Sequence, residues 1–243
     1  MANLVLEKNI DEFNRDVQAR SGYEYTATDR LSCRIANEHL SEMVHAMCGD
    51  LTGKTIADVG CGDGTYTVEF LKFKPKSILG IDPARVSIRS AKRKFKNPKL
   101  TFKTGNIYTL SSLKKRFDVV VVRGVLHHVY QPEKAISQLS RIAKILVIAE
   151  PNGYNPILKL IEKTSSYHRA HEEKSYPAAK VNKWVTDNNG RVESSMFGGL
   201  VPFFCPDPIV NILKKLEPVV ENTVAFNRLL TASYICKCSF TEK

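Results

Sequence analysis

The chain has 243 residues, of which 43% are hydrophobic and 25% are charged, and its formal net charge is +11. These values are ordinary for a globular protein that can bury a core. No run of about 18 uncharged apolar residues is present, and the N-terminal residues lack the pattern of a signal peptide, so we expect a soluble, cytoplasmic protein. The positive charge is compatible with an anionic partner or simply with good solubility.

The first 50 residues predict a helical cap on the main domain. Residues 1–22 have a weak helical pattern, and residues 29–47 have a clearer one, with Leu31, Ile35 and Met43 on one face. Six cysteines, distributed from the cap to the last strand, follow no spacing that is typical of disulfides or zinc, so we expect free thiols in a reducing compartment.

Residues 51–150 alternate between short β-branched runs and helical segments. We expect strands at 55–59, 77–81, 99–103, 117–122 and 144–149, and helices near 65–73, 84–96 and 132–143. Such runs, buried on both faces and separated by helices, predict an α/β fold with a mostly parallel, doubly wound sheet.

The pattern is less regular after residue 150. Residues 151–175 are rich in turn formers and predict an irregular lid. We expect a helix near 177–188, a strand near 191–197, an apolar turn at 198–206, one or two helices over 208–230 and a last strand over 232–240. No repeat or linker divides the chain, so we expect a single domain over 1–243.

The most informative stretch is 56–64, Ile-Ala-Asp-Val-Gly-Cys-Gly-Asp-Gly, which predicts a strand that runs into a ligand-binding turn. Asp58 and Asp63 place two carboxylates at this turn, where they would repel a pyrophosphate and attract a cation. Thr65 stands where dinucleotide-binding proteins have glycine or alanine, and Asp82 ends the second strand, where it can bind both ribose hydroxyls. These features together predict a site for a cationic nucleoside.

Four motifs make the chain resemble the class I S-adenosylmethionine-dependent methyltransferases, especially the branch with quinone-biosynthesis and small-molecule enzymes. The motifs are Asp58-Val-Gly-Cys-Gly-Asp-Gly64, Gly80-Ile-Asp82-Pro83, Gly105-Asn106-Ile107 and Phe117-Asp-Val-Val-Val-Val-Arg-Gly-Val-Leu-His-His128. The resemblance implies a Rossmann-like, seven-stranded sheet with an antiparallel last strand, a helical cap (1–50), a cofactor-binding core (51–150) and acceptor-side segments (151–175 and 198–230).

The resemblance also implies S-adenosylmethionine as cofactor, S-adenosylhomocysteine as product and no metal ion. Asp58 would lie near the cofactor's ammonium group and Asp82 would hold its ribose, whereas Asn106 stands where an aspartate is more usual at the adenine. The implied cofactor-binding residues are Tyr23, Tyr25, Asp58, Gly60, Cys61, Gly62, Asp82, Pro83, Asn106, Ile107, Arg123 and Gly124. Two of these have simpler alternative roles, because Tyr23 and Tyr25 would otherwise only pack the cap.

Catalysis would need a base only where the acceptor must lose a proton, because the protein otherwise aligns acceptor, methyl carbon and sulfur. His127, His128 and His171 are the candidate catalytic residues, with packing or surface positions as the alternatives. His168 and His171 would share one face of a helix, but no third ligand follows and no metal site is expected.

Five further residues are candidate acceptor contacts: Asn152, Tyr154, His168, Phe203 and Phe204. The apolar residues of 202–220 would line a hydrophobic pocket, cover the sheet or form a dimer interface. The basic residues of 85–99 predict a solvated helix face, with an anionic membrane surface or a carrier protein as alternative partner.

Nucleic acid is not expected as a partner, because the chain lacks the Asp/Asn-Pro-Pro-aromatic motif, a Pro-Cys nucleophile and an RNA-binding module. The expected activity is S-adenosylmethionine-dependent methyl transfer to an oxygen, carbon or nitrogen atom of a small, hydrophobic or aromatic acceptor. The alternatives are an RNA or protein methyltransferase and a non-catalytic S-adenosylmethionine-binding protein. The location would be cytoplasmic, with peripheral membrane contact as an option.

Overall fold

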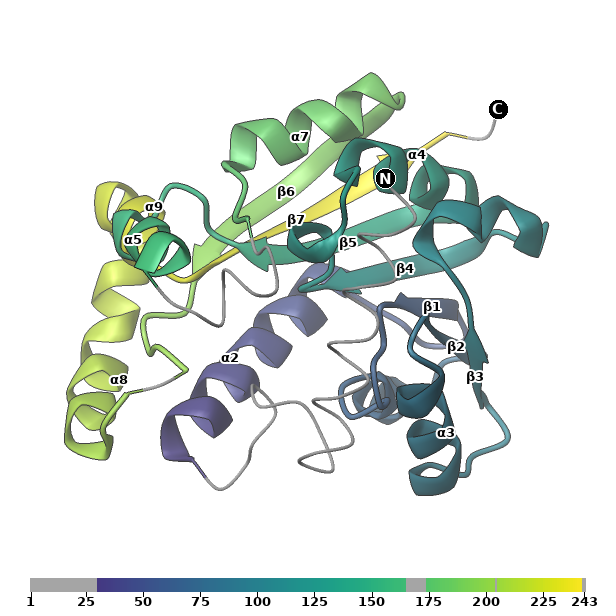
Figure 1. The fold of residues 1–243 in the computed structure, drawn as a ribbon, viewed down its shortest axis with the longest axis horizontal. Coiled ribbons are helices and arrows are strands. Elements are labelled where there is room, and N and C mark those ends of the chain that lie inside the picture. Colours follow the sequence, from purple (N-terminus) through teal and green to yellow (C-terminus); the bar gives the residue numbers. More distant parts are fainter. Residues whose placement is uncertain (1–29, 165–173, 204, 242–243) are drawn as a thin grey trace.

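A computed structural model describes residues 30–164, 174–203 and 205–241 (Figure 1). Its centre is a seven-stranded sheet in the order β3-β2-β1-β4-β5-β7-β6. The first five strands pair in parallel, whereas β7 lies antiparallel between β5 and β6, which confirms the predicted doubly wound sheet with an antiparallel last strand. The strands are β1 (Thr55–Val59), β2 (Ser77–Asp82), β3 (Leu100–Thr104), β4 (Phe117–Arg123), β5 (Ala143–Pro151), β6 (Gly190–Gly198) and β7 (Ser233–Phe240).

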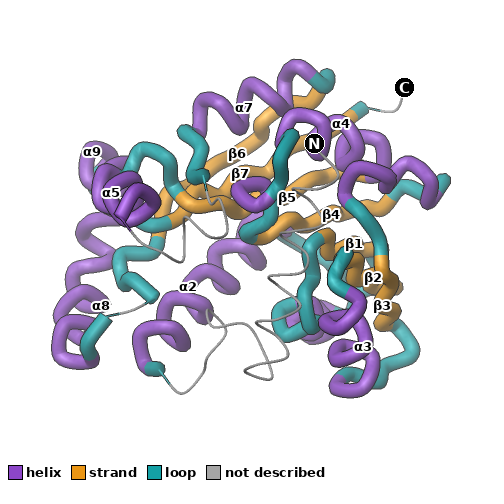
Figure 2. Tube along the Cα trace, in the orientation of Figure 1, coloured by secondary structure: helices purple, strands orange, loops and turns teal. Residues whose placement is uncertain are grey.

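Helices cover both faces of the sheet, which is why β4 and β5 are apolar on both sides (Figure 2). One face is covered by α2 (Leu31–Cys48), the 3-10 helix η2 (Thr67–Phe73) and α3 (Arg85–Lys94). The other is covered by η3 (Ile107–Leu113), α4 (Pro132–Ile142) and α7 (Ala178–Asp187), and η4 (Leu126–His128) is a short 3-10 turn after β4.

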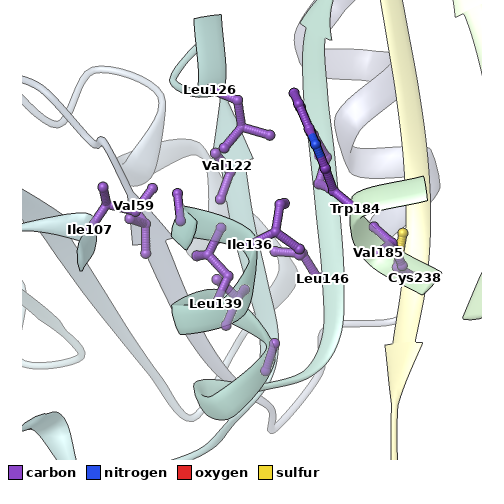
Figure 3. Close-up of a cluster of buried hydrophobic side chains, with 14 of the residues drawn as sticks. Val59, Ile107, Val122, Leu126, Ile136, Leu139, Leu146, Trp184, Val185 and Cys238 are labelled. Carbon is purple, nitrogen blue, oxygen red and sulfur yellow. The ribbon is translucent and has the colours of Figure 1, made fainter. Parts of the chain in front are cut away.

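The larger part of the core lies between the sheet and the helices α4 and α7 (Figure 3). Ile136 and Leu139 of α4 are fully buried in one cluster with Val122 and Leu146 of the sheet. Trp184 of α7 belongs to the same cluster. Burial of each such side chain contributes about 1.5–3 kcal/mol, so this cluster holds β4 and β5, and the loops that follow them, in fixed positions.

A third group of helices lies beyond the carboxyl ends of β5 and β6: α5 (Pro156–Thr164), α8 (Asp207–Asn222) and α9 (Val224–Leu230) (Figure 1). Helix α5 corrects the expectation of an irregular segment after residue 150. Residues 156–164 contain no glycine, and their one proline stands at the helix start, where its missing N–H is not needed.

Two other expectations can be compared with the structure. All six cysteines are free, as predicted. The helix expected near 65–73 is instead the 3-10 helix η2, which begins only at Thr67, after the bonds that close the glycine turn.

Among the helices of the described residues, none combines the length and apolar character that crossing a membrane requires.

Candidate functional site

The glycine turn after β1 depends on backbone conformations that other residues rarely adopt. Gly60, Gly62 and Gly64 have φ angles of 82°, 54° and 82°. A Cβ atom on Gly60 would lie 2.2 Å from a methyl carbon of Val125, in the loop after β4. The turn therefore packs directly on the carboxyl end of β4, as a strand-to-ligand turn at this edge requires.

The turn is also bonded to the end of β2. The backbone N–H groups of Gly60 and Cys61 donate to the carbonyl of Ile81, at 2.7 and 3.1 Å. The N–H of Gly62 donates to one carboxylate oxygen of Asp82 at 2.9 Å, and the other oxygen accepts from Ala84 N–H at 2.8 Å. Asp82 is thus fixed in one orientation beside the turn, and its remaining lone pairs can accept further bonds.

Asp58 and Asp82 are two buried carboxylates at this edge, 5% and 8% exposed. Burial raises the pKa of each to about 6, although Asp58 accepts a 2.5 Å bond from the hydroxyl of Thr67. A buried charge that is incompletely compensated favours a cationic ligand. The donor set therefore fits a nucleoside that carries a positive charge.

Asp63, the third acid of the turn, already has partners. Its carboxylate accepts from the Thr65 hydroxyl at 2.7 Å and forms a 2.6 Å ion pair with Lys94 of α3. Burial raises the pKa of the neighbouring Cys61 thiol, so this thiol stays protonated and is a poor nucleophile. Asp63 stabilises the turn and is less available to a ligand than Asp58 or Asp82.

Arg123, at the end of β4, directs its side chain towards α2. Its guanidinium donates to the Ser41 hydroxyl at 2.8 Å and to the Asn37 side-chain oxygen at 3.0 Å, and it stacks on the ring of Tyr66 at 3.7 Å. Only the backbone of Arg123 and Gly124 is left to face a ligand at this strand end, which is the part predicted to contact the cofactor.

A histidine and a glutamate lie together after β4 and β5. Nδ1 of His127 is 2.8 Å from Oε2 of Glu150, and Glu150 also accepts from the backbone N–H groups of Val125, Leu126 and His127 at 2.7 to 3.1 Å. A carboxylate at this distance can accept a hydrogen bond from Nδ1–H, and in that tautomer Nε2 is the basic nitrogen. The ring of His128 lies 3.8 Å from that of His127, measured between centroids.

Glu150 was not among the predicted site residues. The available signal was an acid at the carboxyl end of a buried strand, where ligands of open α/β sheets bind. Its 3% exposure and its bonds to the backbone of Val125, Leu126 and His127 now give it the role of fixing His127.

The predicted contacts of the adenine and the acceptor have local roles in the structure. The side-chain oxygen of Asn106 caps η3 by accepting from Tyr108 N–H at 2.9 Å. Asn152 is fully buried and donates to the carbonyls of Arg228 and Thr231 at 2.9 and 3.0 Å. The ring of Tyr154 stacks against Arg228 at 4.2 Å, so these residues join β5 to α9.

The remaining predicted residues give less information. Pro83 directly follows β2, and Ile107, which is buried, is the first residue of η3 after β3. Phe203 is half-buried, and its carbonyl accepts from Ser32 of α2 at 2.7 Å. Five predicted residues lie outside the described part of the chain and stay predictions: Tyr23, Tyr25, His168, His171 and Phe204.

One group of three potential metal ligands occurs among the described residues, at some distance in sequence from the glycine turn. His39 of α2 lies 2.7 Å from Glu221 of α8, with Glu217 close by. The bond to Glu221 raises the pKa of His39 to about 9, so the histidine is protonated at neutral pH. The protonated His39 thus supplies the positive charge that balances the carboxylates of Glu217 and Glu221. The three side chains connect α2 to α8.

Comparisons with known proteins agree on one kind of domain. Residues 57–146 match a family described as a methyltransferase domain. An uncharacterised methyltransferase of Schizosaccharomyces pombe is 34% identical over 109 residues, which are 41% of this chain and 37% of that protein. A tRNA U34 carboxymethyltransferase of Campylobacter concisus is 33% identical over 92 residues, which are 37% of this chain and 32% of that protein. The chain therefore spans only about a third of the length of these relatives.

A solved structure shares the fold over most of the chain. The magnesium protoporphyrin IX methyltransferase of Synechocystis, with bound S-adenosylhomocysteine, has a TM-score of 0.61 at 18% identity, over 86% of this chain and 85% of that one.

Proposed function

We propose that this chain, which carries a methyltransferase domain in the fold of the class I enzymes, transfers a methyl group from S-adenosylmethionine to a small, hydrophobic or aromatic acceptor. One observation carries the proposal. Two buried carboxylates, Asp58 and Asp82, flank a left-handed glycine turn, and both have a pKa raised to about 6. They suit a nucleoside with an ammonium and a sulfonium, and they would disfavour an anionic dinucleotide.

The glycine turn and the neighbouring strand ends then supply the groups that would hold the cofactor. Asp82 would accept hydrogen bonds from the ribose hydroxyls through the lone pairs that Gly62 and Ala84 leave free. Asp58 would compensate the ammonium group, and the backbone of Gly60 and Gly124 would let the methionyl part approach closely. Bound S-adenosylmethionine supplies an electrophilic methyl group.

His127 is the residue best placed to remove a proton from an acceptor. Glu150 holds Nδ1–H, so Nε2 is basic and stays in one orientation. The same carboxylate fixes three backbone N–H groups of the loop, so the position of His127 relative to the glycine turn is set by rigid elements. A hydroxyl or acidic carbon as acceptor would need this base, whereas an amine would need only alignment.

An RNA acceptor is the second candidate, because the curated relatives include tRNA U34 carboxymethyltransferases and the chain carries a net charge of +11. Their similarity covers 37% of this chain, about the length of the cofactor-binding part, and therefore supports a shared donor more than a shared acceptor. The alternative of a non-catalytic cofactor-binding protein is weakened by the ordered pair of His127 and Glu150.

Two measurements test these proposals. Calorimetry with S-adenosylmethionine should detect binding that Asp82→Ala removes, and unchanged binding in this variant would contradict the assigned site. Formation of S-adenosylhomocysteine should then be measured with lipid extracts, aromatic metabolites and total tRNA in parallel. Activity with tRNA alone would replace the small-molecule acceptor by RNA, and cofactor binding without any turnover would favour the non-catalytic alternative.

A further inference from the structure

Helix α8 turns two of its acidic side chains, Glu217 and Glu221, towards the protein. Glu217 is 7% exposed and accepts from the backbone N–H of Leu200 at 2.6 Å. Glu221 accepts from Gly199 N–H at 2.7 Å and pairs with His39 at 2.7 Å. Together with the buried Val210, these carboxylates attach α8 to α2 and to the loop after β6.

The opposite face of α8 is apolar and exposed. Ile209, Ile212, Leu216 and Val219 have exposed fractions of 47, 59, 49 and 65%. Their spacing of three, four and three residues places them on one stripe of the helix. A surface helix normally buries its apolar stripe and exposes its charges, so α8 is oriented the other way and leaves this stripe without a partner among the described residues.

The neighbouring helices extend the apolar surface. Helix α9 contacts both α8 and α5, and the three helices gather at one end of the molecule (Figures 1 and 2). Val224 and Phe226 of α9 and Ile157 and Leu160 of α5 are all more than half exposed. We call α5, α8 and α9 together the apolar end.

The charges of the apolar end are mainly positive. Its exposed bases are Lys163, Lys214, Lys215 and Arg228, and its exposed acid is Asp207. The other acids of these helices are less exposed and bonded, including Glu162, which pairs with Lys159 at 3.1 Å. A second copy of the chain would bring like charges together at this surface, whereas anionic lipid headgroups would neutralise them.

We propose that the apolar end docks the protein on an anionic lipid bilayer. The stripe of α8 enters the boundary between headgroups and acyl chains, and Lys215, which flanks the stripe, contacts lipid phosphates, as in interfacial amphipathic helices. The apolar end lies beyond the carboxyl ends of β5 and β6, so docking brings the edge of the sheet that binds ligands close to the membrane. The inference rests on this surface alone and does not depend on methyl transfer.

The test is sedimentation of the full-length protein with vesicles of phosphatidylcholine containing a quarter phosphatidylglycerol, and with vesicles of phosphatidylcholine alone. We expect binding to the anionic vesicles, weakened about tenfold by Ile212→Gln with Val219→Gln, because the inserted apolar area is lost. Lys215→Gln, next to the stripe, should also weaken it, by about fivefold. The matched control, Arg89→Gln with Arg93→Gln on the basic helix α3, should bind like the wild type.

Circular dichroism and thermal melting of the α8 variants establish that they fold, which is expected because the substituted side chains are exposed. Three results would overturn the proposal. The first is no binding by the wild type, and the second is loss of binding only in the α3 variant. The third is a wild-type dimer in analytical ultracentrifugation that the α8 variants convert to monomers, because the stripe would then be a contact between copies of the chain.

Discussion

Replacing Asp58 by asparagine should stabilise the ligand-free protein while it weakens cofactor binding. Asp58 is 5% exposed, and burial raises its pKa from 3.8 to about 6. At neutral pH the folded state must therefore hold a carboxylate in a place that disfavours its charge. Asparagine keeps an oxygen that can accept the bond from the Thr67 hydroxyl, and it removes the charge.

The magnitude follows from the pKa difference. A rise from 3.8 to about 6 corresponds to an upper limit of about 3 kcal/mol at about 1.36 kcal/mol per pKa unit. We expect a gain of about 1–2 kcal/mol at pH 7, since asparagine makes a weaker bond to Thr67 than a carboxylate does. Because the folded pKa is the higher one, the favourable contribution of Asp58 is fully present below pH 3.8 and is lost as the pH rises through 6. The advantage of the variant should therefore disappear at acid pH.

Asp118 provides the matched control, because it is also a strand aspartate. Its carboxylate accepts from the backbone N–H and the hydroxyl of Thr55 at 2.9 and 2.7 Å and pairs with Lys144 at 2.9 Å. These donors, the Thr55 N–H first, hold the pKa of Asp118 well below its usual range. Asp118→Asn should therefore destabilise the protein at pH 7, the opposite sign from Asp58→Asn.

Urea denaturation of both variants at pH 4 and pH 7 measures these free energies of unfolding, and calorimetry measures the binding of S-adenosylmethionine. We expect Asp58→Asn to bind at least about tenfold more weakly, since the ligand's ammonium loses its counter-charge. A variant that is less stable than the wild type at pH 7 would refute the electrostatic reasoning. Unchanged binding would refute the assignment of Asp58 to the cationic ligand.

Three further predictions concern the rest of the chain. Gly60→Ala should lower the free energy of unfolding by about 1–3 kcal/mol in urea titrations, because a Cβ is strained at a φ of 82° and meets a valine methyl 2.2 Å away. Glu150→Gln should lower kcat with little change in the cofactor Kd, since the loop after β4 loses its charged acceptor. The pair of His39 with Glu221 should stabilise the fold fully below pH 6.5 and lose this effect as the pH rises through about 9, and His39→Gln should flatten that dependence in denaturation measured at pH 6 and pH 10.

The glycine turn and the strands around it could be predicted because their information is local in the chain. The glycine turn needs left-handed backbone at fixed spacing, and Asp82 is placed by the end of one strand, so a short stretch specifies each. Glu150 could not be assigned in this way. Its partners lie 23 to 25 residues earlier in the chain, and only the parallel pairing of β4 and β5 brings them together.

The orientation of α8 was even less accessible from the sequence. Its apolar periodicity is real, and the usual inference is that such a stripe faces the core. The structure has the stripe outward because the inward positions hold Glu217 and Glu221, whose partners are N–H groups of residues 199 and 200 and the ring of His39. Neither the turn that presents these N–H groups nor the distant histidine is visible in the pattern of residues 208–230. The sequence therefore left open whether the stripe lines a pocket, covers the sheet or forms an interface, and the structure leaves it exposed among the described residues.

Helix α2 connects the donor site to the apolar end. Asn37 and Ser41 are four residues apart, on the same face of the helix, and both bind Arg123 of β4, which lowers the pKa of Asp58. His39 lies between them in sequence, about 200° around the helix from Asn37, and pairs with Glu221 of α8. Helix α2 therefore bonds to Arg123 on one face and to α8 on the other. A movement of α8 would be transmitted to Arg123 through this single helix, with no loop in between. The segment predicted to be a packing cap thus bonds both to Arg123, next to the carboxylates proposed to hold the methyl donor, and to the helix proposed to meet lipid.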